Sequence, residues 1–422
     1  MIAAAIADST QTPGSSERGV AGIVALLSAE AVRARCRMVH DWVAEGRSPH
    51  FAIEPKRLQV VADAVAQVTR AAYPDLRIPY HSRWRHFVVG GGDRWQELAA
   101  QLPADPLERA RAAIDLATVS VLLDAGAGAA WRYRDAPSGL TLGRSEGLAI
   151  ASLAMFDAGA FSSDPQMPWR CDSEALQGID AATLARHFQV TADNALIGLD
   201  RRAALLRRLG AALAARPDLF GGACPRPGHL VEHVLARGRR VQAADILAML
   251  LDGLSSIWPS GMVLGGIPIG DAGRHPAVRT SDETDGIVPF HKLSQWLTYS
   301  LLEPIEAAGV EVVEIDALTA LPEYRNGGLL IDHGVIRPRA PIDPAKAFEV
   351  CSELIVEWRA LTVTLMDQLL MPVRERLGLG DAFKLPHLLQ GGTWSAGRKV
   401  ARTLRPPDGP PPIAVAADGT VF

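Results

Sequence analysis

Residues 105–128, DPLERARAAIDLATVSVLLDAGAG, carry the clearest helix pattern in the chain and indicate its fold class. Asp105 can cap the helix, Pro106 suits its first position, and Glu108 stands three residues after the cap, as in many helix starts. The apolar run then stops before Gly126, and glycine commonly ends a helix. The segment therefore predicts one long helix.

Similar patterns predict helices along most of the chain, whereas the strand-like stretches are short. The longest helix is expected to open at Asp343 and Pro344 and to run to about Gly378. No linker divides the chain, so we expect one mainly helical domain with a few short strands over residues 1–402 and an extended Pro/Gly-rich tail over 403–422. The other expected helices cover 27–46, 54–72, 145–158, 174–188, 191–215, 229–236 and 240–253, and the expected strands cover 85–89, 310–315 and 329–336.

The composition argues against several classes of protein. Hydrophobic residues make up 48% and charged residues 21% of the 422 residues, and the formal net charge is -4. Neither a nucleic-acid surface nor a polybasic membrane patch is indicated. The apolar runs are too short for a membrane span, and the N-terminus lacks a signal-peptide pattern. The four cysteines lie far apart, which is typical of a reducing compartment. These features predict a cytoplasmic protein and leave its oligomeric state open.

A dense group of polar residues lies in the stretch 321–329, LPEYRNGGL. A carboxylate, a phenol and a guanidinium follow one another at Glu323, Tyr324 and Arg325, and Asp332 comes shortly after. Two glycines close the group, and they can let the backbone turn tightly beside a ligand. The alternative is an ordinary surface ion pair between Glu323 and Arg325.

A second polar group begins near Asp285 and continues through VPFHKLSQW, residues 288–296. Lys292 and Gln295 fall on one line of the expected helix, and His291 stands at its start. Such a line either faces solvent or forms the floor of a pocket. The acidic residues before the helix are equally consistent with caps.

Three further segments are candidates for a site. Glu357 and Arg359 flank the apolar stripe of the long helix on opposite sides, where a charged side chain either reaches solvent or lines a cleft. Trp258 stands at a helix end, either buried in a turn or placed against a substrate. The segment 81–95 is the most basic and aromatic of the chain, and it could hold a phosphate or a planar group.

One motif points to different chemistry. His229, Glu232 and His233 match the H-x-x-E-H pattern of one class of zinc proteases. Two histidines four residues apart on a helix can share a zinc ion, with the glutamate as base. The same spacing also arises by chance, and two prolines stand just before it. We therefore expect no bound metal and no cofactor.

Five segments together resemble the uracil-catabolism protein family of fungi and bacteria, the fourth protein of that ring-opening pathway. The resemblance covers nearly the whole chain. The segments are SEGLA at 145–149, DGLSSIWP at 252–259, VPFHKLSQWLTYSLLEP at 288–304, LPEYRNGG at 321–328 and VEWRALTV at 356–363.

A weaker similarity links the chain to the queuosine-nucleotide salvage glycosylases. Their motifs have counterparts at 291–292, 323–325 and 357–360, with Glu323 in place of an aspartate. This similarity implies a helical body like that of the helix-hairpin-helix DNA glycosylases.

The family resemblance implies hydrolysis of the N-glycosidic bond of a ribosyl-urea intermediate, with its 5′-phosphate, to release urea. The partner is then a small ribosyl phosphate. The alternatives are a zinc-dependent amidohydrolase of the same pathway and a non-catalytic assembly protein. A glycosidase needs a carboxylate beside C1′. Glu323 is the first candidate for this carboxylate and Glu357 the second, with Asp285 and Asp332 in reserve.

The other candidate residues would bind the substrate. Tyr324 or His291 would donate a hydrogen bond to the urea, and Gln295 would bind the ribose. The phosphate would be bound by Lys292, Arg325 and Arg359. Trp131 or Trp258 would form a wall of the pocket.

Overall fold

The computed structural model describes residues 17–128, 130–258, 261–343 and 345–416. Within these residues the protein is mainly helical with short strands, as the sequence predicts. The similarity to helix-hairpin-helix glycosylases stays a prediction. The main helices are α2 (Glu17–Ala25), α3 (Ala29–Ala44), α4 (Leu58–Ala72), α5 (Arg94–Ala99), α6 (Pro106–Leu122), α7 (Arg144–Asp157), α8 (Ser173–Gly178), α9 (Ala181–His187), α10 (Leu199–Ala215), α11 (Pro217–Phe220), α12 (Leu230–Ala236), α13 (Ala243–Leu254), α14 (Lys292–Ala307), α15 (Tyr324–Asp332), α16 (Glu353–Leu377), α17 (Leu385–Leu388) and α18 (Trp394–Leu404).

Shorter elements connect the helices, and their strands pair two by two. The 3₁₀ turns are η1 (Pro55–Arg57), η2 (Arg83–Phe87), η3 (Pro227–His229), η4 (Ser255–Ile257) and η5 (Ile315–Ala317), and η6 (Leu389–Thr393) is π-helical. The antiparallel pairs are β1 (Phe51–Ile53) with β12 (Ile336–Pro338), β2 (Val88–Val89) with β3 (Gly92–Asp93), β4 (Tyr133–Arg134) with β5 (Thr141–Leu142), β7 (Met262–Leu264) with β8 (Ile267–Gly270), and β9 (Ala272–Arg274) with β10 (Ile287–Pro289). The parallel pairs are β6 (Arg240–Gln242) with β11 (Glu311–Val313) and β13 (Ala347–Phe348) with β14 (Ala414–Val415).

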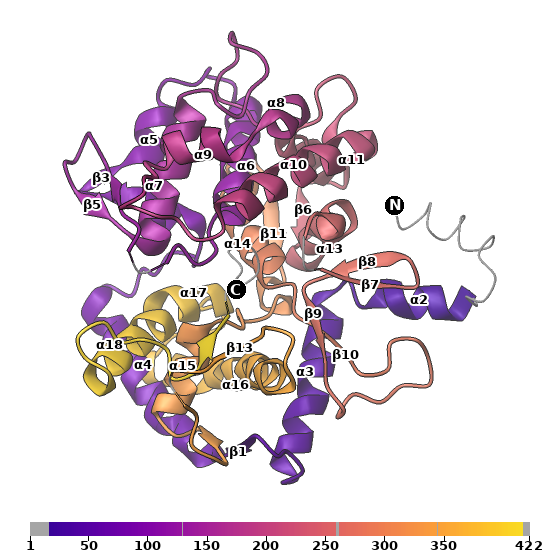
Figure 1. Ribbon diagram of the computed structural model, residues 1–422, viewed down its shortest axis with the longest axis vertical. Helices are drawn as coiled ribbons and strands as arrows, with labels where there is room; N and C mark the ends of the chain where they lie inside the picture. Colours follow the sequence, from indigo (N-terminus) through magenta and orange to yellow (C-terminus); the bar gives the residue numbers. More distant parts are fainter. Residues whose placement is uncertain (1–16, 129, 259–260, 344, 417–422) are drawn as a thin grey trace.

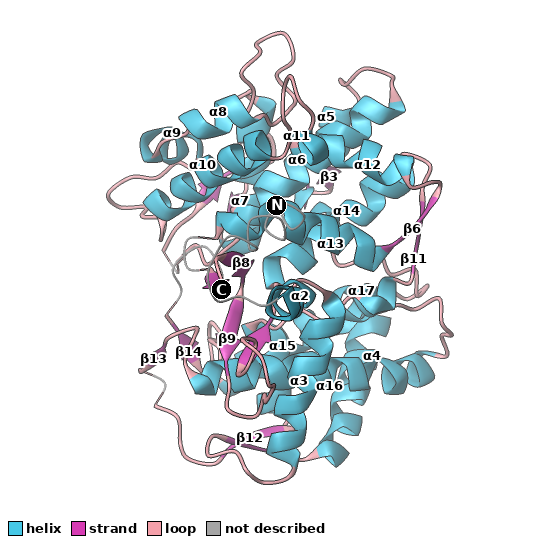
Figure 2. Cartoon of the chain, turned by 90° about the vertical axis from the view of Figure 1, so that its right-hand side faces the viewer, coloured by secondary structure: helices cyan, strands magenta, loops and turns pink. Residues whose placement is uncertain are grey.

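The helices form two groups, one on each side of α14. Helices α5 to α11 gather in the upper part of Figure 1, and α3, α4, α15, α16 and α18 gather in the lower part. Figure 2 shows the same division from the side. Helix α14 packs against α6 and α13, whereas α16 packs against α3 and α4. Both α6 and α16 are buried on nearly all sides, as expected for helices that are apolar around most of their circumference.

Local capping explains where α6 begins. The Asp105 side chain accepts a hydrogen bond from the backbone N–H of Leu107 at 3.0 Å, and Pro106 is the first helical residue. Helix α16 ends before Gly378, whose φ of +69° is left-handed and is therefore favourable for glycine. Both ends confirm the sequence prediction.

Other predicted boundaries are wrong. The expected strand over 329–336 belongs up to Asp332 to helix α15, which begins at Tyr324 under the Glu323 cap. Helix α16 opens at Glu353 instead of Asp343, and Pro344 lies outside the described residues. Residues 85–87 of the expected strand 85–89 belong to the 3₁₀ turn η2, and only Val88 and Val89 form a strand. The expected helices 174–188 and 191–215 are reduced to α8, α9 and α10.

The residues after α18 turn back onto the helical body. Ile413 is fully buried there, and β14 pairs with β13. The predicted division between a domain and a tail at residue 402 stays a prediction. No helix among the residues that the structure describes is long and apolar enough to cross a membrane.

Candidate functional site

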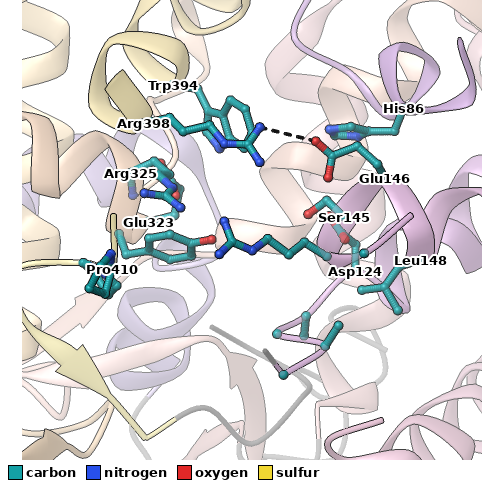
Figure 3. A pocket seen from close by; sticks show the side chains of 18 of the residues that line it. His86, Asp124, Ser145, Glu146, Leu148, Glu323, Arg325, Trp394, Arg398 and Pro410 are labelled. Carbon is teal, nitrogen blue, oxygen red and sulfur yellow. Dashed lines mark hydrogen bonds and ion pairs between the residues drawn. The ribbon is translucent and has the colours of Figure 1, made fainter. Parts of the chain in front are cut away.

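A cavity of about 1060 Å³ lies between the two groups of helices. Its size is close to the upper end for small-molecule sites, roughly 300–1000 Å³. One wall comes from the end of α6 and the start of α7, and the other comes from α15, α18 and residues 406–415 (Figure 3). Its charged lining residues are Asp124, Arg132, Arg144, Glu146, Lys292, Glu323, Arg325, Arg398, Arg402 and Asp408.

Glu323 is held in the cavity wall as the N-cap of α15. Its two carboxylate oxygens accept hydrogen bonds from the backbone N–H groups of Arg325 at 2.7 Å and Asn326 at 2.6 Å. Burial raises the pKa of Glu323, although these two N–H groups and the nearby Lys292 lower it in part. The carboxylate is therefore fixed in orientation, and the two N–H groups and Lys292 offset part of the penalty that burial places on its charge.

Lys292 is the first residue of α14 and belongs to the same wall. Its backbone N–H donates to a carboxylate oxygen of Asp271 at 3.0 Å. Burial lowers the pKa of its ammonium to about 8, helped by Arg359 and opposed by Glu323, Asp271 and Asp124. A lysine with this pKa is mostly protonated at neutral pH and can still give up its proton.

Tyr324 follows Glu323 and also lines the cavity. Burial, followed by the charge of Glu323, raises the pKa of its phenol. The hydroxyl therefore keeps its proton at neutral pH and remains a hydrogen-bond donor. The guanidinium of Arg325 lies over its ring at 5.0 Å and donates to the backbone oxygen of Gly409 at 2.9 Å.

Arg83 supports the cavity wall that is formed by the end of α6 and the start of α7. This fully buried side chain forms an ion pair with Asp124 at 3.2 Å. It also donates to the hydroxyl of Ser120 at 2.7 Å and to the backbone oxygen of Ser145 at 3.2 Å. Arg83 thus connects the C-terminal end of α6 to the start of α7. Figure 3 shows Asp124, Ser145 and Glu146 on one side, and Glu323 and Arg325 on the other.

Aromatic rings form the part of the lining near α14. The ring of Trp296 stacks with His81 at 6.4 Å between centroids and meets His86 edge to face at 5.9 Å. Burial lowers the pKa of both histidines, so both imidazoles are neutral at pH 7. These two histidines come from the segment 81–95 that the sequence marks as basic and aromatic.

Of the twelve predicted site residues, Glu323, Tyr324, Lys292 and Arg325 meet in this cavity. Two other predicted residues of the α14 region point elsewhere. The ring Nε2 of His291 lies 2.8 Å from the backbone oxygen of Leu26. Gln295 is fully buried, where its amide exchanges hydrogen bonds with Thr319.

Glu357 and Arg359 of α16 also lie outside the cavity lining. Glu357 is fully buried between the hydroxyl of Ser48 at 2.5 Å and the ring Nε2 of His275 at 3.0 Å. Arg359 binds both oxygens of Asp271, at 2.8 and 2.7 Å. Because Asp271 also accepts from the backbone of Lys292, Arg359 supports the site from behind.

The two predicted tryptophans are packed in the protein interior. Trp131 is fully buried beside Phe188, and its indole N–H donates to the backbone oxygen of that residue at 3.0 Å. Trp258 is also buried, close to Gly270. Neither lines the cavity.

The two reserve carboxylates bind arginines away from the cavity. Asp285 accepts from Arg279 at 3.2 Å in an exposed loop. Asp332 pairs with Arg405 at 2.6 Å, where Asp332 itself is nearly buried.

The side chains of His229 and Glu232 in the H-x-x-E-H segment contact neighbouring residues of the protein. The ring Nδ1 of His229 lies 2.7 Å from the backbone oxygen of Phe220, and Glu232 pairs with Arg111. Across the described part of the chain, no three His, Cys, Asp or Glu side chains gather in a way that could hold a metal ion.

Comparison with known proteins gives the family. The model of the family described as "Protein of unknown function (DUF1688)" matches residues 25–422. The chain belongs to this family. Protein urg3 of Schizosaccharomyces pombe is 39% identical over 411 residues, which cover 95% of this chain and 99% of that protein. Uracil catabolism protein 4 of Lachancea kluyveri is 36% identical over 431 residues, which cover 94% of this chain and 98% of that protein. These relatives confirm the family that the sequence motifs predict.

Several lining residues of this DUF1688 member escape motif analysis. Asp124 lies just after α6, and Arg144 and Glu146 stand at the start of α7. Glu146 belongs to the segment 145–149 that carries the family resemblance, but it has no predicted role. Arg398 and Arg402 lie one turn apart on α18. The sequence could have indicated Arg144, because it stands at the start of a helix. That α7 lies near α18 depends on tertiary packing and cannot be read from the sequence.

Proposed function

We propose that this protein acts in uracil catabolism and hydrolyses the N-glycosidic bond of a ribosyl-urea intermediate, releasing urea and the ribose moiety. The pathway follows from the relative named Uracil catabolism protein 4. The observation that carries the reaction is that the Glu323 carboxylate and the Lys292 ammonium line the same cavity. Each is among the charges that shift the pKa of the other.

Glu323 is suited to the electron-deficient centre of this reaction. As the C–N bond breaks, positive charge develops on the ribose at C1′, and a fixed carboxylate lowers the energy of that transition state. Both oxygens of Glu323 already accept backbone hydrogen bonds. The carboxylate is thus oriented before substrate binds, and it serves as an electrostatic stabiliser.

Lys292 is suited to protonate the leaving group. Urea leaves easily only if its departing nitrogen receives a proton, because a urea anion is a poor leaving group. The pKa of Lys292, about 8, makes it an efficient acid near neutral pH. The phenol of Tyr324 adds a second donor that can hydrogen-bond the urea oxygen.

Asp124 is suited to activate the attacking water from the opposite wall. One of its oxygens is paired with Arg83 at 3.2 Å, which fixes the carboxylate. Water then adds its hydroxyl to C1′ and gives its proton to Asp124, while the Lys292 proton leaves with urea. Transfer of a proton from Asp124 to Lys292 restores both groups, so one water is consumed for each bond broken.

The test is an assay of both products with pure protein. Synthetic ribosyl-urea 5′-phosphate is incubated with and without a chelator, and urea, ammonia and ribose 5-phosphate are measured. Equal amounts of urea and ribose 5-phosphate, resistant to the chelator, are expected. Ammonia release that the chelator abolishes would instead support a zinc amidohydrolase. Binding of the substrate without any product would contradict the reaction and leave a non-catalytic role in the pathway.

A further inference from the structure

Four arginines from three separate elements meet in the cavity wall. Arg144 begins α7, Arg325 belongs to α15, and Arg398 and Arg402 lie on α18. Burial lowers the pKa of Arg398, and the charges of Arg402, Arg144 and Arg325 lower it further, while Glu146 opposes them. The guanidinium groups of Arg402, Arg144 and Arg325 are therefore near enough to repel that of Arg398.

These like charges are poorly compensated by the protein itself. Glu146 pairs with Arg398 at 3.6 Å, as Figure 3 shows. Within the described ranges, no carboxylate lies within ion-pairing distance of Arg144, Arg325 or Arg402. Arg405, just after α18, contrasts with them because it is paired with Asp332. A bound anion would relieve the repulsion that the other three arginines exert on Arg398.

The arginines are also held in place by groups that leave their charge available. Arg398 lies over the ring of Trp394 at 5.0 Å, and Arg325 lies over the ring of Tyr324 at the same distance. Stacking on an aromatic face fixes a guanidinium without neutralising it.

The start of α7 adds backbone donors to the same place. Gly143, its N-cap, has no side chain that could accept from the first N–H groups of this 14-residue helix. Gly143, Arg144, Ser145 and Glu146 all line the cavity. An uncapped helix N-terminus favours an anion. Arg144 has a left-handed φ of +55°, a conformation that is costly for a residue with a side chain.

We propose that Arg144, Arg325, Arg398 and Arg402 form a phosphate-monoester site, so that the substrate of this cavity must carry a phosphate on its ribose. Arginine matches phosphate because its planar fork donates two parallel hydrogen bonds. That the sugar is a ribose rests on the proposed function. The phosphate site itself predicts that a substrate without phosphate binds weakly.

Direct binding to the full-length protein tests this site without any catalysis. Titration calorimetry compares ribose 5-phosphate, ribose and inorganic phosphate. Ribose 5-phosphate is expected to bind much more tightly than ribose, and inorganic phosphate is expected to compete with it. Arg398→Gln and Arg402→Gln are each expected to weaken ribose 5-phosphate about 10–100-fold and to leave ribose unchanged. Arg402 is exposed, so its replacement is compatible with folding.

Lys399→Gln is the matched control, since it removes one charge from the same helix at a residue outside the large cavity. Equal affinities for ribose and ribose 5-phosphate, or an Arg402→Gln variant no weaker than Lys399→Gln, would overturn the proposal. Equal urea release from ribosyl-urea with and without its 5′-phosphate would refute the phosphate site and leave the reaction intact. Arginine-dependent binding of ribose 5-phosphate without urea release would support the site and refute the reaction.

Discussion

Replacing Glu323 by glutamine removes one charge from the cavity and keeps the shape of the side chain. In the native protein both carboxylate oxygens accept backbone N–H groups of α15. Glutamine retains one acceptor oxygen and turns an NH₂ group toward the second N–H. We expect the loss of this second N-cap hydrogen bond to lower the free energy of unfolding by about 1 kcal/mol. A protein of ordinary stability remains folded after such a loss.

The expected effect on catalysis is much larger. A carboxylate about 4 Å from a unit positive charge contributes about 4 kcal/mol at an effective dielectric constant of about 20. Since about 1.4 kcal/mol corresponds to a factor of ten in rate, the Glu323→Gln variant should lose about three powers of ten in kcat. Binding of ribose 5-phosphate should change little, because that product carries no developing positive charge.

The assay is urea release from ribosyl-urea 5′-phosphate, normalised to the folded fraction measured by circular dichroism. Glu306→Gln is the matched control. Burial raises the pKa of Glu306 as it does that of Glu323, but Glu306 bonds to Tyr80 at 3.3 Å and lies outside the cavity. A folded Glu323→Gln variant as active as Glu306→Gln would refute the role of this carboxylate.

Three other predictions follow from the same contacts. Because burial lowers the pKa of Lys292 to about 8, kcat should fall as the pH rises through about 8, where the acid loses its proton; the same fall in Lys292→Arg would assign it to another group. Asp271→Asn leaves the guanidinium of Arg359 buried without its carboxylate, so urea denaturation should show a loss of about 3–5 kcal/mol, and an unchanged midpoint would contradict the importance of this pair. Glu357→Gln should lower Tm through the bond to His275 and leave the kcat/KM of the folded protein unchanged; a selective loss of kcat/KM would show that Glu357 acts in the site.

Local rules account for the parts of the fold that the sequence predicts well. An Asp-Pro cap and a terminal glycine act within a few residues, so the start of α6 and the end of α16 can be read from the chain. The Gly327–Gly328 pair shows the limit of such rules. It suggests a turn, but a Cβ at Gly327 would lie 2.6 Å from the Trp358 indole nitrogen. Gly327 therefore permits close packing of α15 on α16, and Gly328 faces Pro412 of the segment after α18; only the tertiary structure reveals these contacts.

The candidate site was predictable where its residues are adjacent in sequence. Glu323, Tyr324 and Arg325 form one motif, and Lys292 was conspicuous at a helix start. The opposite wall depends on α6 and α7 meeting through buried Arg83, and no periodicity predicts that contact. Glu357 and Arg359 carried strong chemical signals, but each is matched by a buried partner, so their polarity serves the interior of the protein.

The cavity wall draws on segments from His81 to Val415, and this has a practical consequence. A ligand that fills it would bridge both groups of helices, and its binding energy would add to the stability of the whole molecule. At a ligand concentration of about 100 times Kd, this addition is about 2.7 kcal/mol. A thermal-shift screen of small phosphorylated sugars would therefore report occupancy of the cavity directly, and candidate ligands could be ranked before their turnover is measured.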